Sequence, residues 1–193
     1  MTVSGLTSAA GRLTPEAARA LFPILQRAGT VVESEIRGPS MGSTLPDGTR
    51  IHIRCGPVTT CRAGEVVAFL GVQGLVAHRV ISLRRAHDAP GYLLTRGDAL
   101  TLCDPPIPSH AALGVVTEWR RGDPDSWVPV PGPPPRRPVA AVVDGLAVGL
   151  LRIHPALAHW IVVRLLMIRG VFVRIRRRLG PGSAPAARAP VSP

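Results

Sequence analysis

The sequence predicts a mostly β fold: a compact β domain of sandwich or barrel type, with a short N-terminal helix and a helical, apolar, arginine-rich C-terminal tail. Two observations support this prediction. Between residues 31 and 119, short apolar segments alternate with turns rich in Gly, Pro and Asp, a spacing typical of compact β domains. After residue 138, the turns give way to a long apolar stretch interrupted by arginines. A chain of 193 residues has room for one domain with its own core and an appendage.

The N-terminal part, 1–30, is predicted to be a helical segment. Thr14 is the expected N-cap, Pro15 suits the first helical position, and Glu16 suits the first turn of a helix over 14–28. Pro23 is expected to kink this helix or to end it early, because a proline inside a helix removes a hydrogen bond.

The β domain is expected to span 31–119. From residue 31 to 37 the pattern has the period of two that a strand requires. Uncharged residues on one face (Val32, Ser34, Ile36) alternate with charged residues on the other (Glu33, Glu35, Arg37). The expected strands, in order, are Val31–Arg37, Arg50–Arg54, Glu65–Leu70, Leu75–Leu83, Tyr92–Thr95 and Ala112–Trp119. A proline-rich, extended linker (120–138) and the apolar, basic helical tail with a disordered end (139–193) follow.

The charge of the chain lies mainly in its tail. All 23 basic residues are arginine, and the formal net charge is +11. The tail holds eight arginines and one acid, Asp144, which favours contact with an anionic membrane surface. Nucleic acid is a less favoured partner, because the sequence shows no zinc finger, base-reading helix or RNA-stacking motif. Arg164 and Arg169 interrupt the apolar stretch, so we expect it to lie at the interface or to dock on another protein rather than to span. The alternative is a helical hairpin that packs on its own domain.

The three cysteines point to neither a metal nor a cofactor. Cys55, Cys61 and Cys103 form no CxxC motif and have no Cys/His ligand spacing. We expect buried thiols, with a bridge between Cys55 and Cys61 as the alternative.

Ser40, within "RGPSMGSTLPD", is the first candidate for chemistry. A serine beside Pro and Gly is ordinarily a turn former, so the alternative is a structural role. As a nucleophile it would need open space, which Gly38 provides, and a backbone N–H for an oxyanion, which its own amide provides.

A nucleophilic serine also needs a base, and the composition limits the choice. The chain has no lysine, which leaves histidine as the base available near neutral pH. His78, in the apolar strand "LVAHRVIS", shares a face with Val76 and Val80, although a buried core histidine is the alternative. Asp98 and Asp104 are candidates to orient the imidazole, or else they cap turns.

These motifs, in their order along 31–119, resemble the type I signal peptidase family. The matching stretches are "GPSMGSTLPDG", "GEVVAF", "VAHRV", "RGDALTLCD" and "LGVV". The likeness is greatest to the branch found in archaea, in the endoplasmic reticulum and in some bacteria, where histidine replaces the general-base lysine. The resemblance implies a β-rich catalytic domain and a serine endopeptidase that cleaves signal or leader peptides after small residues.

The resemblance also implies a role for each matching residue. Ser40 would be the nucleophile, Met41 would pack beside it and shape the substrate cleft, and His78 would be the general base. Asp104 would orient His78, and Asp98 would be a supporting carboxylate.

The sequence departs from the family pattern at Ser43, Thr49 and Ala99, where Pro, Asp and Asn are usual. We also expect no N-terminal membrane anchor of the kind the family has, so the tail is expected to provide attachment. We expect a location at the cell membrane, peripheral or C-terminally anchored, with the cytoplasm as the alternative.

Three functional alternatives remain open, two from these departures and one from the arginine content. The first is a dedicated peptidase for a single leader peptide or partner. The second is a non-catalytic peptide-binding module of the same fold, and the third is an arginine-driven nucleic-acid binder.

Overall fold

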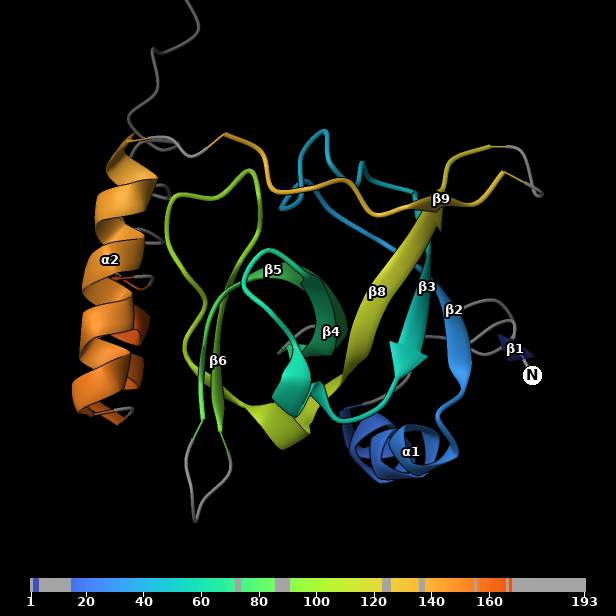
Figure 1. Cartoon of the computed structure of the whole chain (residues 1–193), viewed down its shortest axis with the longest axis horizontal. Helices are drawn as coiled ribbons and strands as arrows, with labels where there is room; N and C mark the ends of the chain where they lie inside the picture. Colours follow the sequence, from blue (N-terminus) through green and yellow to red (C-terminus); the bar gives the residue numbers. More distant parts are fainter. Residues whose placement is uncertain are drawn as a thin grey trace, which may run out of the picture.

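A single, strongly twisted sheet forms the centre of the molecule (Figure 1). The computed structural model describes residues 2–3, 15–71, 74–85, 91–122, 126–135, 138–154, 156–165 and 167. The strands are β1 (Thr2–Val3), β2 (Val31–Glu35), β3 (Arg50–Cys55), β4 (Val66–Gly71), β5 (Gly74–Arg84), β6 (Tyr92–Arg96), β7 (Ile107–Pro108), β8 (Ala112–Arg120) and β9 (Val128–Pro129). The helices are α1 (Pro15–Ala28) and α2 (Pro138–Ile153), with two single 3₁₀ turns, η1 (Val58–Thr60) and η2 (Ser109–Ala111).

The strands are arranged in the order β1-β2-β3-β8-β4-β5-β6-β7, and β9 pairs with β8. Every pairing is antiparallel except that of β1 with β2. The mostly β fold is therefore confirmed at the level of class. Each of the six expected strands is present within two residues of its expected ends. The two-residue strands β1, β7 and β9 were not expected, because so short a segment carries no periodic pattern.

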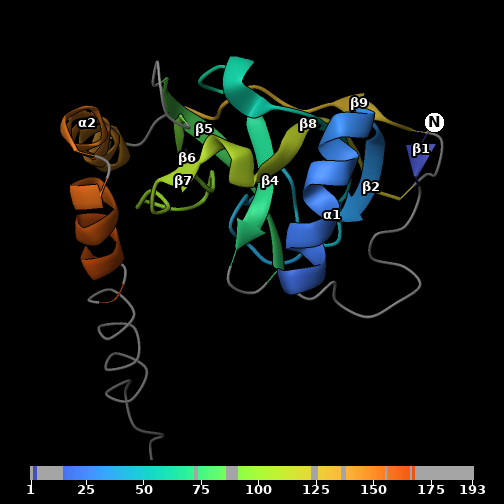
Figure 2. The same ribbon diagram turned by 90° about the horizontal axis from the view of Figure 1, so that it is seen from below.

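Helix α1 lies across the sheet near β8, β3 and β4 (Figure 2). The expectation that the helix ends early at Pro23 is wrong, since the helix continues to Ala28. Pro23 lies on the exposed face, while Phe22 and Leu25 pack into the main apolar cluster and hold the helix on both sides of the proline. Thr14, the expected N-cap, lies outside the described residues.

The apolar core has two large clusters within the β domain. One joins α1 to strands β2, β3, β4 and β8, and the other joins β4, β5 and β6. Cys55, Cys61 and Cys103 are buried free thiols, so no bridge joins Cys55 to Cys61. Burial raises the pKa of both Cys55 and Cys61 to about 11, which keeps these thiols protonated and unreactive at neutral pH.

The proline-rich segment is partly built into the domain. Strand β9 pairs with Glu118 and Trp119 of β8, and Val130 packs against the main cluster. Beyond it, α2 lies against β5 and β6, followed by a further helix over 156–165 (Figures 1 and 2). The two C-terminal helices are therefore shown. The rest of the expected tail, 168–193, with its arginine cluster and disordered end, lies outside the described residues.

Candidate active site

Ser40 lies in a turn that directly follows β2. Gly38 enters this turn with φ +98°, a conformation that favours glycine, and its N–H donates to Asp47 Oδ1 at 2.7 Å. The Gly42 N–H donates to the Pro39 carbonyl at 3.0 Å and closes the turn around Ser40. Ser40 is thereby held in one position and remains partly accessible.

The backbone N–H of Ser40 has no hydrogen-bond partner within the described part of the chain. A Cβ added at Gly38 would meet nothing within 4 Å, so the space over that residue is open. A free amide beside open space can donate to an oxyanion that forms on an incoming carbonyl.

His78, on β5, is buried and has both ring nitrogens paired. Its Nε2 lies 2.9 Å from Ser40 Oγ, and its Nδ1 lies 2.6 Å from Asp104 Oδ2. The ring of Phe69, on the neighbouring strand, meets the imidazole edge to face at 6.0 Å. Three residues far apart in sequence are thus joined by a continuous line of hydrogen bonds.

The partners of Asp104 fix the protonation pattern of this line. Asp104 Oδ2 also accepts a hydrogen bond from Thr95 Oγ1 at 2.7 Å. A carboxylate only accepts, so we assign the proton to His78 Nδ1. His78 Nε2 is then free to accept the Ser40 hydroxyl proton, which is the tautomer that general-base catalysis requires.

Asp98 lies away from His78 and pairs with the next residue of β5. Arg79 Nη2 and Nε donate to its two oxygens at 2.7 and 2.8 Å, and both side chains are almost fully buried. Arg79 Nη1 also donates to the Gly64 carbonyl at 2.6 Å. Of the two candidate acids, Asp104 therefore contacts the imidazole, and Asp98 ties its loop to β5 through Arg79.

Gly97 brings the acid-bearing loop close to the serine. A Cβ at this position would collide with the Ser40 carbonyl and would lie 3.1 Å from His78 Nε2. The neighbouring Ala99 N–H donates to the same carbonyl at 2.9 Å. Glycine is required here because no side chain fits between the loop and the serine.

A groove of about 220 Å³ opens beside Ser40 and His78. One wall comes from the end of β2 and the residues after it, and the other comes from the first half of β5. The lining residues are Ser34, Glu35, Ile36, Arg37, Ser40, Ile51, Leu75, Val76, Ala77 and His78.

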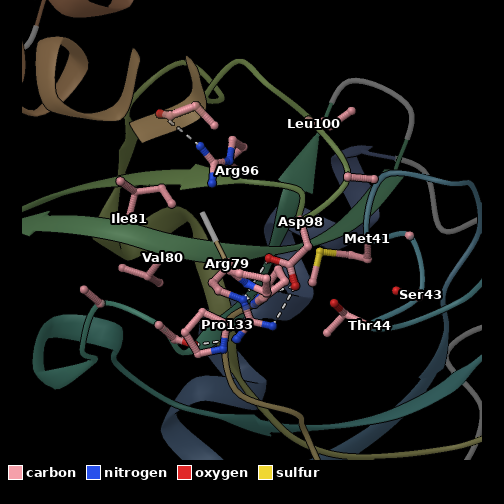
Figure 3. Close-up of a pocket in the computed structure, with 17 residues that line it drawn as sticks. Met41, Ser43, Thr44, Arg79, Val80, Ile81, Arg96, Asp98, Leu100 and Pro133 are labelled. Carbon is pink, nitrogen blue, oxygen red and sulfur yellow. Dashed lines mark hydrogen bonds and ion pairs between the residues drawn. The ribbon is translucent and has the colours of Figure 1, made fainter. Parts of the chain in front are cut away.

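A second cavity, of about 410 Å³, is lined in part by the residues that follow Ser40, from Met41 to Thr44 (Figure 3). Met41 lines this cavity and not the groove, and it is buried in the main cluster. Figure 3 shows the Arg79–Asp98 pair at the cavity, with Pro133 of the linker nearby. The expected contribution of Met41 to the substrate cleft therefore does not extend to the groove beside His78.

The three positions that depart from the resembled family play unequal parts. Ser43 is exposed, whereas Thr49 is fully buried with no partner for its hydroxyl among the described residues. Ala99 donates its backbone amide to the Ser40 carbonyl and also lines the larger cavity.

Sequence reasoning missed several residues that support the site. Thr95, Arg79 and Asp47 each orient a candidate residue through hydrogen bonds. No sequence signal singles out Arg79 or Thr95 among ordinary strand residues. Asp47 follows Pro46 in a turn, and its side-chain partner nine residues earlier is visible only in the fold.

The fold and the site together define a β domain that carries a Ser–His–Asp hydrogen-bonded line beside a groove. No family model matches the chain, and no curated protein matches it.

Proposed function

We propose that this protein is a serine endopeptidase similar to the Ser/His branch of type I signal peptidases. The observation that carries the proposal is the contact of His78 with Ser40 on one side, at 2.9 Å, and with Asp104 on the other, at 2.6 Å. Both lengths lie within the range that proton transfer needs. The order of the surrounding motifs, described above, supports the same class of reaction.

In the first step, Ser40 Oγ attacks the carbonyl carbon of the scissile bond while its proton passes to His78 Nε2. Asp104 accepts the hydrogen bond from Nδ1 and stabilises the imidazolium that results. The free Ser40 N–H stabilises the oxyanion. The imidazolium then gives its proton to the leaving amine, the C–N bond breaks, and an acyl ester remains on Ser40.

In the second step, water hydrolyses the ester. His78 Nε2 removes a proton from the water, whose oxygen attacks the ester carbonyl, and Ser40 Oγ leaves with a proton returned from the imidazolium. The same base therefore serves both half-reactions, and the protein groups end in their starting protonation state.

The substrate we propose is an extended peptide, such as a signal or leader peptide. Strand β5 pairs with β4 along one edge, and strand β6 pairs with the other edge only from Arg79 onward. Within the described structure, this second edge is therefore unpaired over residues 74–78. A peptide in the groove can add to this edge as a strand. Ile36, Ile51 and Val76 line a groove of only about 220 Å³, which favours small side chains next to the cut.

Covalent capture tests this proposal. Purified protein is treated with a peptide-linked or β-lactam-type acylating probe, and the modified residue is located by peptide mass mapping. We expect a single adduct on Ser40, because among the described residues it is the hydroxyl that is hydrogen-bonded to a histidine ring. Ser43, exposed in the same turn, is the internal control and should stay unmodified. His78→Ala should abolish labelling.

A different outcome would favour the alternative function. If the protein binds a leader peptide in the groove but neither acylates Ser40 nor cleaves the peptide, the domain is a peptide-binding module. If Ser40 is acylated, identification of peptide N-termini in cells with wild type against Ser40→Ala distinguishes a dedicated substrate from secretory preproteins in general.

We further propose that the protein attaches to an anionic membrane surface through its C-terminal helices. Helix α2 buries one face against the domain and exposes large apolar side chains on the other, at Val139, Val142, Leu146 and Ile153. In the following helix Trp160 is exposed, and the Arg164 guanidinium stacks over its ring at 5.4 Å. Exposed apolar and aromatic side chains beside arginines are typical of helices that lie at a lipid interface.

Within the described residues, no helix has both the length and the apolarity to cross a bilayer. A peripheral attachment is consistent with this finding, and the arginines at 169–178 supply further positive charge in the sequence.

Vesicle binding checks this attachment. We expect the Val142→Asp/Leu146→Asp variant to bind vesicles of mixed phosphatidylcholine and phosphatidylserine at least tenfold more weakly, because charge replaces two apolar contacts. Flotation or surface plasmon resonance measures the affinity. Val128→Asp, at an exposed valine of β9, is the matched control and should bind as wild type does. Equal binding by all three proteins would contradict the proposed surface.

A further inference from the structure

Helix α2 carries a buried acid on the face that packs against the sheet. Its buried positions are Ala140, Asp144, Ala147 and Leu151, spaced as one side of a helix. Three of the four are apolar, and Asp144 is only 3 % exposed. A carboxylate in such a face is costly unless it is paired, so its partners indicate what it does.

The partners of Asp144 lie at the two ends of the loop that carries the site. Arg96 Nη1 donates to Asp144 Oδ1 at 2.6 Å, and Cys103 Sγ donates to the same oxygen at 3.2 Å. Arg96 directly precedes Gly97, and Cys103 directly precedes Asp104. Asp144 Oδ1 therefore accepts hydrogen bonds from both ends of the loop, from Arg96 and from Cys103.

The cysteine is suited to this contact. Burial and the hydrogen bond to Asp144 raise the pKa of the Cys103 thiol, so it stays protonated and donates. Cys103 also packs with Leu94, Ala147 and Leu151 in a small apolar cluster between β6 and α2. Arg96 reaches α2 a second time through the Ala140 carbonyl, at 3.4 Å.

The loop between these anchors makes most of the contacts that align the site. Gly97 packs against the Ser40 carbonyl and the His78 ring, and the Ala99 amide donates to that carbonyl. At the end of the loop, Asp104 accepts from His78. A shift of either end of the loop would therefore change the geometry at Ser40 or at the imidazole.

We propose that Asp144 is a positioning residue, which holds the loop over 97–103 at both ends so that Asp104 and Gly97 align His78 with Ser40. This inference rests on the proposed function. It makes α2 part of the catalytic apparatus even though no α2 side chain reaches the reacting atoms. Displacements of about 1 Å cost on the order of 10²-fold in rate, so loss of this anchor should be visible in catalysis.

The test compares the full-length Asp144→Asn variant with wild type. We expect kcat to fall about 10- to 100-fold with KM changed less than threefold, because loop geometry is altered and the groove is not. Cys103 should be alkylated faster in the folded variant, with Cys55 and Cys61 as internal controls. The low-field proton resonance of the His78–Asp104 hydrogen bond should shift or broaden.

Glu33→Gln is the matched control. Glu33 is also a buried acid, paired with Arg50 at 2.7 Å and Arg120 at 3.1 Å, but it contacts no part of the loop. Its loss should lower thermal stability while kcat, Cys103 alkylation and the His78 resonance stay as in wild type.

The double variant Arg96→Met/Asp144→Leu separates positioning from stability. Replacing a buried ion pair by apolar side chains ordinarily preserves stability. We expect its Tm to stay near that of wild type and its kcat to remain low; full wild-type kcat would overturn the proposal. Wild-type protein that neither cleaves peptide nor acylates Ser40 would instead refute the proposed function, while Cys103 alkylation and the His78 resonance would still test the anchor.

Discussion

Replacing Ser40 by alanine is expected to lower kcat/KM for peptide cleavage about 10⁶-fold, the loss typical of removing the nucleophile of a serine hydrolase triad. The physical reason is that His78 then has no hydroxyl to deprotonate, and only binding and the oxyanion donor remain. Cleavage of a fluorogenic leader peptide, followed by mass spectrometry of the products, measures the change.

Two further variants show whether Ser40 and His78 act as one unit. His78→Ala should cost about as much as Ser40→Ala, and the double variant should cost no more than either. Ser43→Ala, which removes a hydroxyl from the same turn, should leave the rate within twofold of wild type. Residual cleavage by Ser40→Ala at more than a hundredth of the wild-type rate would exclude Ser40 as the nucleophile.

Replacing Asp104 by asparagine is expected to lower kcat about 10⁴-fold while the fold is kept. The asparagine amide group can donate to His78 Nδ1, which favours the tautomer with its proton on Nε2. That proton would then point at Ser40 Oγ, 2.9 Å away, and the imidazole would no longer accept the hydroxyl proton. Steady-state kinetics measures the loss of kcat, and circular dichroism of the same preparation checks that the fold is kept.

The chain offers a matched control for this change. His52 Nδ1 lies 3.0 Å from Glu118 Oε2, which makes a second histidine–carboxylate pair, and His52 stacks on Trp127 rather than facing a serine. Glu118→Gln should therefore change kcat less than twofold. A comparable loss in both variants would mean that the Asp104 effect is not specific to the catalytic line.

The strand pattern of the β domain was predictable, because half-buried strands alternate and their turns are marked by Gly, Pro and Asp. Where the structure differs from the prediction, contacts with distant parts of the chain are the cause. Helix α1 passes through Pro23 because Phe22 and Leu25 are held in the core on either side. The linker joins the sheet through β9, and nothing in a proline-rich sequence indicates which edge it will meet.

Ser40, His78 and the two candidate acids were identifiable from their types and order, but their geometry was not. Sequence left the choice between Asp98 and Asp104 open, since both lie beside turn residues. Only the register of β5 and β6 shows that Asp98 meets Arg79 and Asp104 meets His78. The contacts of Asp144 were likewise invisible, because it lies 40 residues beyond Asp104 in an otherwise apolar segment.

The neighbouring residues His78 and Arg79 point to opposite faces of β5, and each meets one acid of the same loop. A slip of one residue in the β5–β6 ladder would exchange the faces. The guanidinium would then face the side of Ser40, and both carboxylates would still find a cation. Such a molecule would have both carboxylates paired, yet it would have no base beside its serine, and Val80 would leave its apolar cluster. Correct strand pairing during folding is therefore a condition of activity. Protein with the wrong register would add to the measured protein concentration and not to the rate of peptide cleavage.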